Sequence, residues 1–163
     1  MKTTIISTLS FASLLALLSG VAIAQPYSIS ADGQEVTDLK TGLIWRRCAE
    51  GMTYSGGTCN GQAGAYTHEQ ALQQAVTVSS NTGTAWYLPN VKELASIVDI
   101  STYTPAINAT VFPATPTGPF WSSSPYAVYS ACPCAWVVNF NHGDIVYTER
   151  TTAYLVRLVR AGQ

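Results

Sequence analysis

Charged side chains are scarce in this sequence of 163 residues. Lysine, arginine, aspartate and glutamate together make up 10% of it, whereas an average globular protein has about a quarter. The formal net charge is −1, and no run or stripe of basic residues occurs. Nucleic acids and anionic membrane surfaces are recognised through clustered Lys and Arg side chains, so neither is an expected partner.

Long apolar runs are missing after residue 24, so the rest of the chain is not expected to span a membrane, which takes about 20 apolar residues. Before that point, Lys2 precedes a mostly apolar stretch over 5–18, and Ala22-Ile23-Ala24 forms a small-x-small cleavage site. We therefore expect residues 1–24 to be a secretory signal peptide. The alternative is an uncleaved N-terminal anchor.

The mature chain of about 139 residues has the size of one domain. We expect an N-terminal lead-in over residues 25–35 and a single domain over residues 36–163. Export places this domain in the periplasm or outside the cell.

Histidine is rare, since His68 and His142 are its only occurrences. The serines at 122–124 have no Gly-x-Ser-x-Gly elbow around them. His68 falls in the first turn of a predicted helix, where we expect it at the surface. No catalytic residue, metal ligand or cofactor is therefore predicted, and the protein is not expected to be an enzyme.

Only four cysteines occur, at positions 48, 59, 132 and 134. Four cysteines allow three pairings, of which we favour Cys48–Cys59 because turn-forming glycines lie between them. Cys132 and Cys134 would then close a tight ring around one proline. Crossed pairings and free thiols remain alternatives, and a free thiol pair would indicate a thiol-dependent enzyme or a soft-metal site.

Two helices are predicted from their capping boxes, in which a side chain at each of two positions bonds the other's backbone N–H. Thr67 and Gln70 begin the first helix. Asn90 and Glu93 begin the second, which is expected over 91–99. The apolar residues of the first helix expected to face the core are Ala71, Leu72, Ala75 and Val76. Around the cap of the second helix, Leu88 and Leu94 are expected to form a hydrophobic staple.

Strand-like segments surround these helices. A turn over 40–42 and a strand over 43–45 precede them, and Arg46 and Arg47 are expected as a solvated strand end. The long connection over 101–119 holds four prolines and is expected to be fixed by Ile107, Val111 and Phe112. Later strands are predicted over 120–124, 135–140, 145–148 and 154–160. This order predicts an α+β fold, with two helices packed beside an antiparallel β-sheet and long loops.

Five residues are candidates for ligand binding. Most of the tryptophans are expected in the core, but one exposed aromatic ring could stack on a sugar. The segment 139–149 holds several Asn, Asp and Glu side chains, which indicate a polar turn first and a weak calcium site second. The candidates are Trp121, Tyr126, Tyr129, Asn141 and Asp144.

Five segments of the sequence form a recognisable series. They are Asp38-Leu-Lys-Thr-Gly-Leu-Ile-Trp45, Trp86-Tyr-Leu-Pro-Asn-Val-Lys-Glu-Leu94, Phe120-Trp-Ser-Ser-Ser124, Ala135-Trp-Val-Val-Asn-Phe140 and Val156-Arg-Leu-Val-Arg160. In this order they resemble successive signatures of the Lcl C-terminal domain family, a bacterial family named for a Legionella collagen-like adhesin.

The resemblance implies a C-type-lectin-like fold and a role in binding or adhesion. The named adhesin's domain is implicated in binding sulfated glycosaminoglycans as a trimer. This chain has no collagen-like segment and no basic groove, so that particular ligand does not carry over. The expected ligand is a glycan or a protein surface, and the remaining alternative is a structural module of the cell envelope.

We expect a thiol reagent to detect no free thiol in the native exported protein, because disulfides are the usual state of cysteines in small exported domains. After denaturation and reduction the same titration should detect all four. Two or more reactive thiols in the native protein would favour the thiol-dependent alternative instead.

Overall fold

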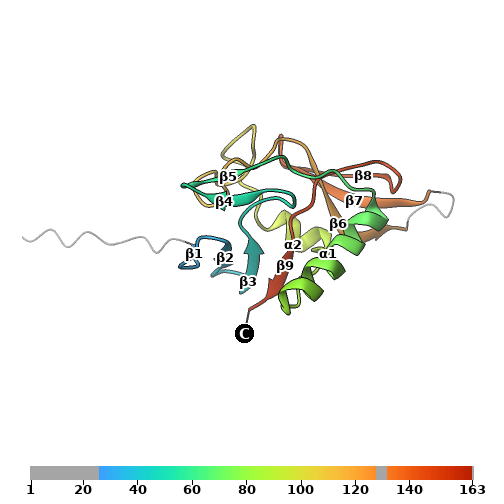
Figure 1. Ribbon diagram of the computed structural model, residues 1–163. Coiled ribbons are helices and arrows are strands. Elements are labelled where there is room, and N and C mark those ends of the chain that lie inside the picture. The colour runs from blue at the N-terminus through green and yellow to red at the C-terminus, as the bar shows by residue number, and fades with distance from the viewer. Residues whose placement is uncertain (1–25, 128–131, 163) are drawn as a thin grey trace, which may run out of the picture.

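The computed structural model describes residues 26–127 and 132–162. Within these ranges the chain forms two helices and nine strands in three antiparallel sheets (Figure 1). The predicted α+β class is therefore confirmed. Neither of the described helices has the length and apolar character needed to cross a bilayer. The expected signal peptide lies outside the described residues.

A four-stranded sheet joins the two ends of the domain. Its order is β1 (Tyr27–Ile29), β2 (Glu35–Asp38), β3 (Leu43–Arg46) and β9 (Val159–Ala161). β1 lies in the segment expected as a lead-in and pairs with β2. A separate two-stranded hairpin, β4 (Thr53–Ser55) and β5 (Thr58–Asn60), follows β3.

The turn that leads into β3 has the predicted chemistry. The Asp38 carboxylate accepts hydrogen bonds from the Lys40 N–H at 2.9 Å and from the Thr41 hydroxyl at 2.7 Å. Gly42 then adopts a φ of 74°, which glycine reaches without a steric penalty. β3 begins immediately afterwards, so the turn and the strand are both confirmed.

Helix α1 (His68–Thr82) begins at its capping box, as predicted. Its buried face differs from the expected stripe. Ala71 and Ala75 are buried, but Leu72 and Val76 are exposed and Val78 is buried in their place. The buried positions follow i, i+4, i+7 spacing, which gives a single narrow stripe. His68 lies three residues before Ala71, so it is the N-terminal member of this buried stripe.

Helix α2 is shorter than expected and ends at Ala95 (Val91–Ala95). Its start is confirmed: Asn90 Oδ1 accepts from the Glu93 N–H, and Glu93 Oε2 accepts from the Asn90 N–H at 2.8 Å. The helix does not continue to residue 99 because the Asp99 N–H bonds instead to the Ala106 carbonyl, in the long connection.

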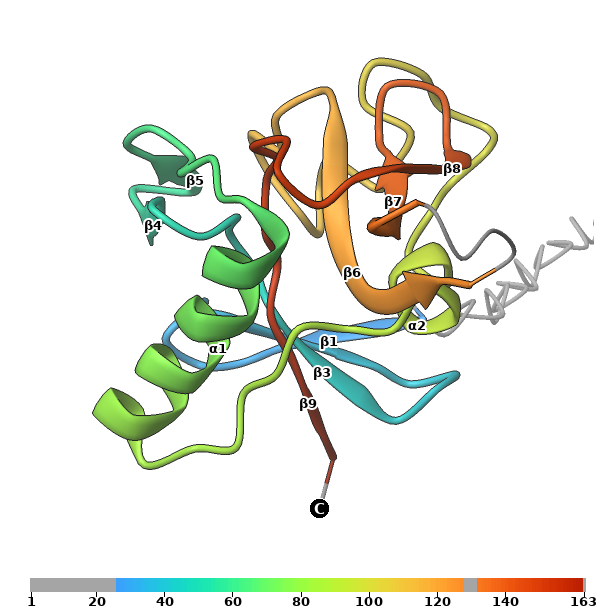
Figure 2. The ribbon, with the colours of Figure 1, turned by 90° about the vertical axis from the view of Figure 1, so that its right-hand side faces the viewer.

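The third sheet is an antiparallel meander of β6 (Pro119–Tyr126), β7 (Cys134–Asn139) and β8 (Asp144–Glu149). The strands predicted in these regions are confirmed. In Figure 2, α1 and α2 lie on either side of the long strand β6. The last predicted strand is shorter than expected: of 154–160 only its end is a regular strand, and the residues before it cross the core with isolated bridges to Tyr66 and Phe120.

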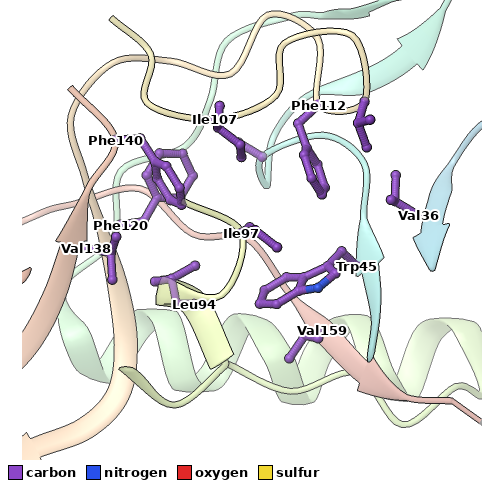
Figure 3. Close-up of a cluster of buried hydrophobic side chains, with 12 residues drawn as sticks. Val36, Trp45, Leu94, Ile97, Ile107, Phe112, Phe120, Val138, Phe140 and Val159 are labelled. Carbon is purple, nitrogen blue, oxygen red and sulfur yellow. The ribbon is translucent and has the colours of Figure 1, made fainter. Parts of the chain in front are cut away.

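Two clusters of buried apolar side chains form the core. Figure 3 shows the first, in which Trp45 of β3 lies near α2, β9 and the long connection. The second lies between α1 and the β6–β7 face and contains Trp86 and Trp121. Leu88 belongs to the second cluster and Leu94 to the first, so the expected staple does not form.

The long connection between α2 and β6 is held by apolar side chains, as predicted. Ile107, Val111 and Phe112 are all buried. Phe112 meets the Tyr27 ring edge-on at a centroid distance of 5.7 Å, and the Ala106 N–H donates to the Phe140 carbonyl at 2.6 Å. The connection is therefore part of the packed domain.

The arginine pair after β3 is not a solvated strand end. Arg47 is buried, its Nε donates to the Val111 carbonyl at 2.9 Å, and its guanidinium lies 4.0 Å from the Tyr54 ring centroid. Arg46 is one-third exposed and pairs with the buried Glu50 at 3.2 Å. The carbonyls and aromatic ring around Arg47 replace the water that a charged group otherwise needs.

Arg157 is the most deeply buried charged residue of the described chain, with no exposed surface. Its Nη1 donates to the carbonyls of Arg46, at 2.9 Å, and of Arg47, and its Nη2 donates to the Thr115 hydroxyl at 2.8 Å. The Phe112 ring centroid lies 4.9 Å from the guanidinium carbon. Burial lowers the pKa of Arg157 to about 9, so the group stays charged at neutral pH.

Replacing Arg157 by methionine should lower the free energy of unfolding by about 3 kcal/mol, because it leaves two buried carbonyls and a hydroxyl without their donor. Chemical denaturation followed by circular dichroism measures this change. Arg160, on β9, offers a matched control: it is partly exposed and pairs with Glu35, so Arg160→Met should cost no more than about 1 kcal/mol. Equal losses in the two variants would contradict this account.

Candidate functional site

Three aromatic side chains gather on one face of the β6-β7-β8 sheet. Trp136 of β7 lies directly opposite Tyr147 of β8, and Tyr126 of β6 lies opposite Cys134. Residues two apart on a strand share a face, so Trp136 lies on the same side as Cys134 and therefore as Tyr126. We call this group, Tyr126, Trp136 and Tyr147, the aromatic face.

The rings of the aromatic face have a definite geometry. Tyr126 and Tyr147 stack in parallel, with centroids 3.9 Å apart and planes 9° apart. Trp136 meets both edge-on, at 5.1 Å from Tyr126 and 6.0 Å from Tyr147. Tyr147 is 48% exposed and the other two are half-buried. The cluster thus combines rigid apolar surface with polar tips.

Exposed apolar side chains continue along β8 from the aromatic face. Ile145 lies two residues before Tyr147 on the same face and is about as exposed, while Val146 points to the other face and is also exposed. Three successive exposed apolar residues are uncommon on a strand of a monomeric domain, and such patches often mark contact sites.

A β-bulge in β6 brings Tyr126 to this face. Trp121 pairs with Val137 and Pro125 pairs with Ala135, so β6 has three residues where β7 has one. The Ser122 hydroxyl fills the gap by donating to the Trp136 carbonyl at 2.7 Å. The bulge thus adds two residues to β6. Because side chains alternate between faces with a period of two, paired residues of β6 and β7 still share a face after the bulge, and Tyr126 lies on the side of Trp136.

Trp121 does not belong to the surface, which corrects its selection as a ligand-binding residue. Its side chain is fully buried, and its Nε1 donates to the Tyr66 carbonyl at 2.8 Å. His68 and Tyr154 pack against its ring at centroid distances of 5.1 and 5.2 Å. Strand alternation places Trp121 on the face opposite Tyr126, where α1 covers the sheet.

Asn141 and Asp144 lie at the turn between β7 and β8, at the far end of β7 from Tyr126. The six residues of β7 span about 17 Å, so one small ligand cannot contact both groups. Asn141 is held by hydrogen bonds of its N–H to Asn139 Oδ1 and of its carbonyl to the Thr104 N–H. The described residues contain no group of three or more His, Cys, Asp or Glu side chains arranged for a metal ion.

All four cysteines are paired. Cys48–Cys59 has a Cα–Cα distance of 5.6 Å, as expected from the glycine-rich loop between them, and Cys132–Cys134 is the second bridge. The second bridge lies at the start of β7, near the aromatic face. Tyr129, the remaining candidate for ligand binding, lies outside the described residues.

His68 is buried, contrary to its expected place at the surface. Its Nε2 lies 3.1 Å from the Ser122 carbonyl, so Nε2 carries the proton in the neutral ring. A cavity of about 290 Å³ borders it, with Leu72 and Arg150 among the lining residues. Desolvation by burial lowers the pKa of His68, and the positive charge of Arg150 acts in the same direction.

Trp136 and Tyr147 were not among the residues selected for ligand binding, although the sequence holds a signal for them. Counting back from the predicted turn over 141–144 places Trp136 opposite Tyr147 in a hairpin of regular register. An aromatic pair across two strands is a recognised stabilising unit of a sheet. The contribution of Tyr126 could not be found this way, because it depends on the bulge.

The fold and the aromatic face together describe a disulfide-bonded α+β domain with a solvent-accessible surface suited to contact. Comparison with models of protein families matches the Lcl C-terminal domain over residues 34–160. The chain belongs to the Lcl C-terminal domain family, over nearly the limits that the five sequence segments indicate. No curated protein matches the sequence.

The buried His68 should make stability depend on pH as the pH falls below about 7. The unfolded chain protonates this group near its ordinary pKa of 6.5, whereas the folded chain does so only at lower pH. The unfolded state therefore binds more protons in this range, and the free energy of unfolding should fall as the pH falls. Replacing His68 with glutamine should flatten this slope in a series of urea denaturation experiments at different pH. A slope that survives in His68→Gln would contradict the assignment.

Proposed function

We propose that this protein is an exported, non-enzymatic binding domain of adhesion type and that its aromatic face binds a glycan. The observation that carries the proposal is the parallel stack of Tyr126 and Tyr147 with Trp136 at its edge. Sugar rings present a face of C–H groups that packs on aromatic rings, while their hydroxyls bond to nearby polar tips.

The charge around the aromatic face supports a neutral glycan over a sulfated one. β8 begins with Asp144 and ends with Glu149, and both side chains are exposed. Arg150 is the nearest base along the chain. An anionic polysaccharide is ordinarily held by several clustered bases, whereas β8 holds two acids and no base.

The non-enzymatic part of the proposal is supported by the state of the reactive groups. Cys132 and Cys134 are bonded to each other, and a disulfide has no thiolate to act as a nucleophile. His68 is enclosed by Trp121 and the Ser122 carbonyl. Neither this bridge nor His68 therefore offers the arrangement that nucleophilic or general acid–base catalysis requires.

We further propose that the fold is C-type-lectin-like and that the mature domain works outside the cytoplasm. The two helices beside antiparallel sheets, the long ordered connection and the two disulfides agree with this proposal. Membership in the family supports the adhesion-type role. A protein surface is the second ligand class, since exposed Ile145 and Val146 adjoin the rings.

A glycan array with the mature chain tests the proposal, with Tyr147→Ala and Tyr147→Phe as a matched pair. The alanine variant loses the stacked ring and should bind the recognised glycan about tenfold more weakly, as the loss of an aromatic contact implies. The phenylalanine variant keeps the ring and should retain most of the binding.

Leu39→Ala serves as a remote control, because Leu39 is exposed on the turn between β2 and β3. It should leave the array signal unchanged. Absence of any glycan signal for the native chain, together with recovery of a protein ligand that also depends on Tyr147, would move the assignment to a protein surface. If Tyr147→Ala binds the glycan as tightly as the native chain and the other two variants do, the aromatic face is not the binding site.

A further inference from the structure

β8 is an edge strand with an unusual set of exposed groups. It pairs with β7 on one side only, in a sheet of order β6-β7-β8. Ile145, Val146 and Tyr147 are each between 45% and 48% exposed. An edge strand offers a row of backbone donors and acceptors to another strand.

The hydrogen-bond pattern identifies which residues of β8 face outward. The Arg150 N–H donates to the Pro133 carbonyl, so these two residues form a hydrogen-bonded pair. Such pairs alternate along an antiparallel ladder, so the even-numbered residues of β8 bond to β7. The backbone groups of Ile145, Tyr147 and Glu149 therefore point away from the sheet. Within the described chain, only the Glu149 carbonyl among them receives a further backbone hydrogen bond, from Thr152.

A second copy of the strand can pair with this edge only in certain registers. Outward-facing residues must lie opposite outward-facing residues. In the antiparallel arrangement centred on Tyr147, that residue faces its own counterpart and Ile145 faces Glu149 of the second copy. This register uses all three outward residues of each strand, whereas a shift of two residues in either direction uses only two.

The charges at the two ends of β8 favour the same register. It places Asp144 opposite Arg150 of the other copy, twice by symmetry, and both side chains are exposed and lie on the same face. No ion pair or hydrogen bond within the described chain engages the Asp144 carboxylate, and Arg150 uses only its Nε, toward the Cys134 carbonyl at 3.2 Å. A parallel pairing would instead bring like charges together.

We propose that two copies of this chain associate through their β8 edges, antiparallel and centred on Tyr147, to form a continuous six-stranded sheet. The interface is isologous, since the same strand serves both copies. Because residues opposite each other share a face, the aromatic faces of the two copies lie on one side of this sheet. Each copy thus adds its Tyr147 beside that of the other. The pairing stands independently of the ligand proposed above.

Complementary charge reversal tests the pairing in sedimentation velocity experiments on the mature chain. Asp144→Arg and Arg150→Asp each create two like-charge contacts, so each variant alone should associate at least about tenfold more weakly than the native chain. In an equimolar mixture both contacts become attractive again, and a heterodimer should form with close to native affinity. Circular dichroism and the native urea midpoint verify that each variant is folded.

A mixture no more associated than the separate variants would overturn the proposal, as would a native chain that stays monomeric up to about millimolar concentration.

If Arg150→Asp fails to fold, cysteine cross-linking tests the pairing by itself. Cα atoms of a hydrogen-bonded antiparallel pair lie about 5.5 Å apart, within the range of a disulfide. Tyr147→Cys should therefore form a covalent dimer on mild oxidation. In Val146→Cys the new thiol would lie opposite Thr148 of the second copy, so the yield of covalent dimer should be at least about tenfold lower. Equal cross-linking of both would refute the register.

Discussion

The domain depends on the burial of one guanidinium. Arg157 lies where β3, the long connection and the C-terminal segment meet, and its donors satisfy carbonyls that an irregular backbone leaves without partners. A buried charge costs free energy unless it is hydrogen-bonded; Nη1 and Nη2 of Arg157 have partners, whereas its Nε has none among the described residues. The aromatic ring of Phe112 supplies further stabilisation to the cation. One side chain thereby links the end of β3 and the segment before β9 to the long connection.

The β6-β7-β8 sheet carries core side chains on both of its faces. Phe120 lies in one core cluster, on the face that also holds Tyr126 and Trp136, and Trp121 lies in the other cluster on the opposite face. The exposed apolar side chains of the sheet are on its edge strand β8. The bulge in β6 keeps the faces of β6 and β7 in step, so Tyr126 returns to the face of Trp136.

Local chemistry made much of the fold predictable from the sequence. Capping boxes located the starts of both helices, and alternation with turn residues located the β6–β8 meander. What failed depends on distant contacts. Arg47 is buried by carbonyls of the long connection, α2 ends early because Asp99 bonds to that connection, and His68 is covered by Trp121. Of the candidate site, Tyr126 was selected from sequence, but its partners required the register and the bulge. No local pattern contains that information.

Arg157 and the carbonyl of Arg46, to which it donates, are 111 residues apart in sequence, and β9 pairs with β3 over a similar separation. A chain that ends before this segment therefore lacks the last strand of the four-stranded sheet, and the Arg46 carbonyl lacks its donor from Arg157. These contacts join residues far apart in sequence, so forming them costs the entropy of closing a long loop. A chain that grows from its N-terminus can therefore complete this domain only when its last residues are present.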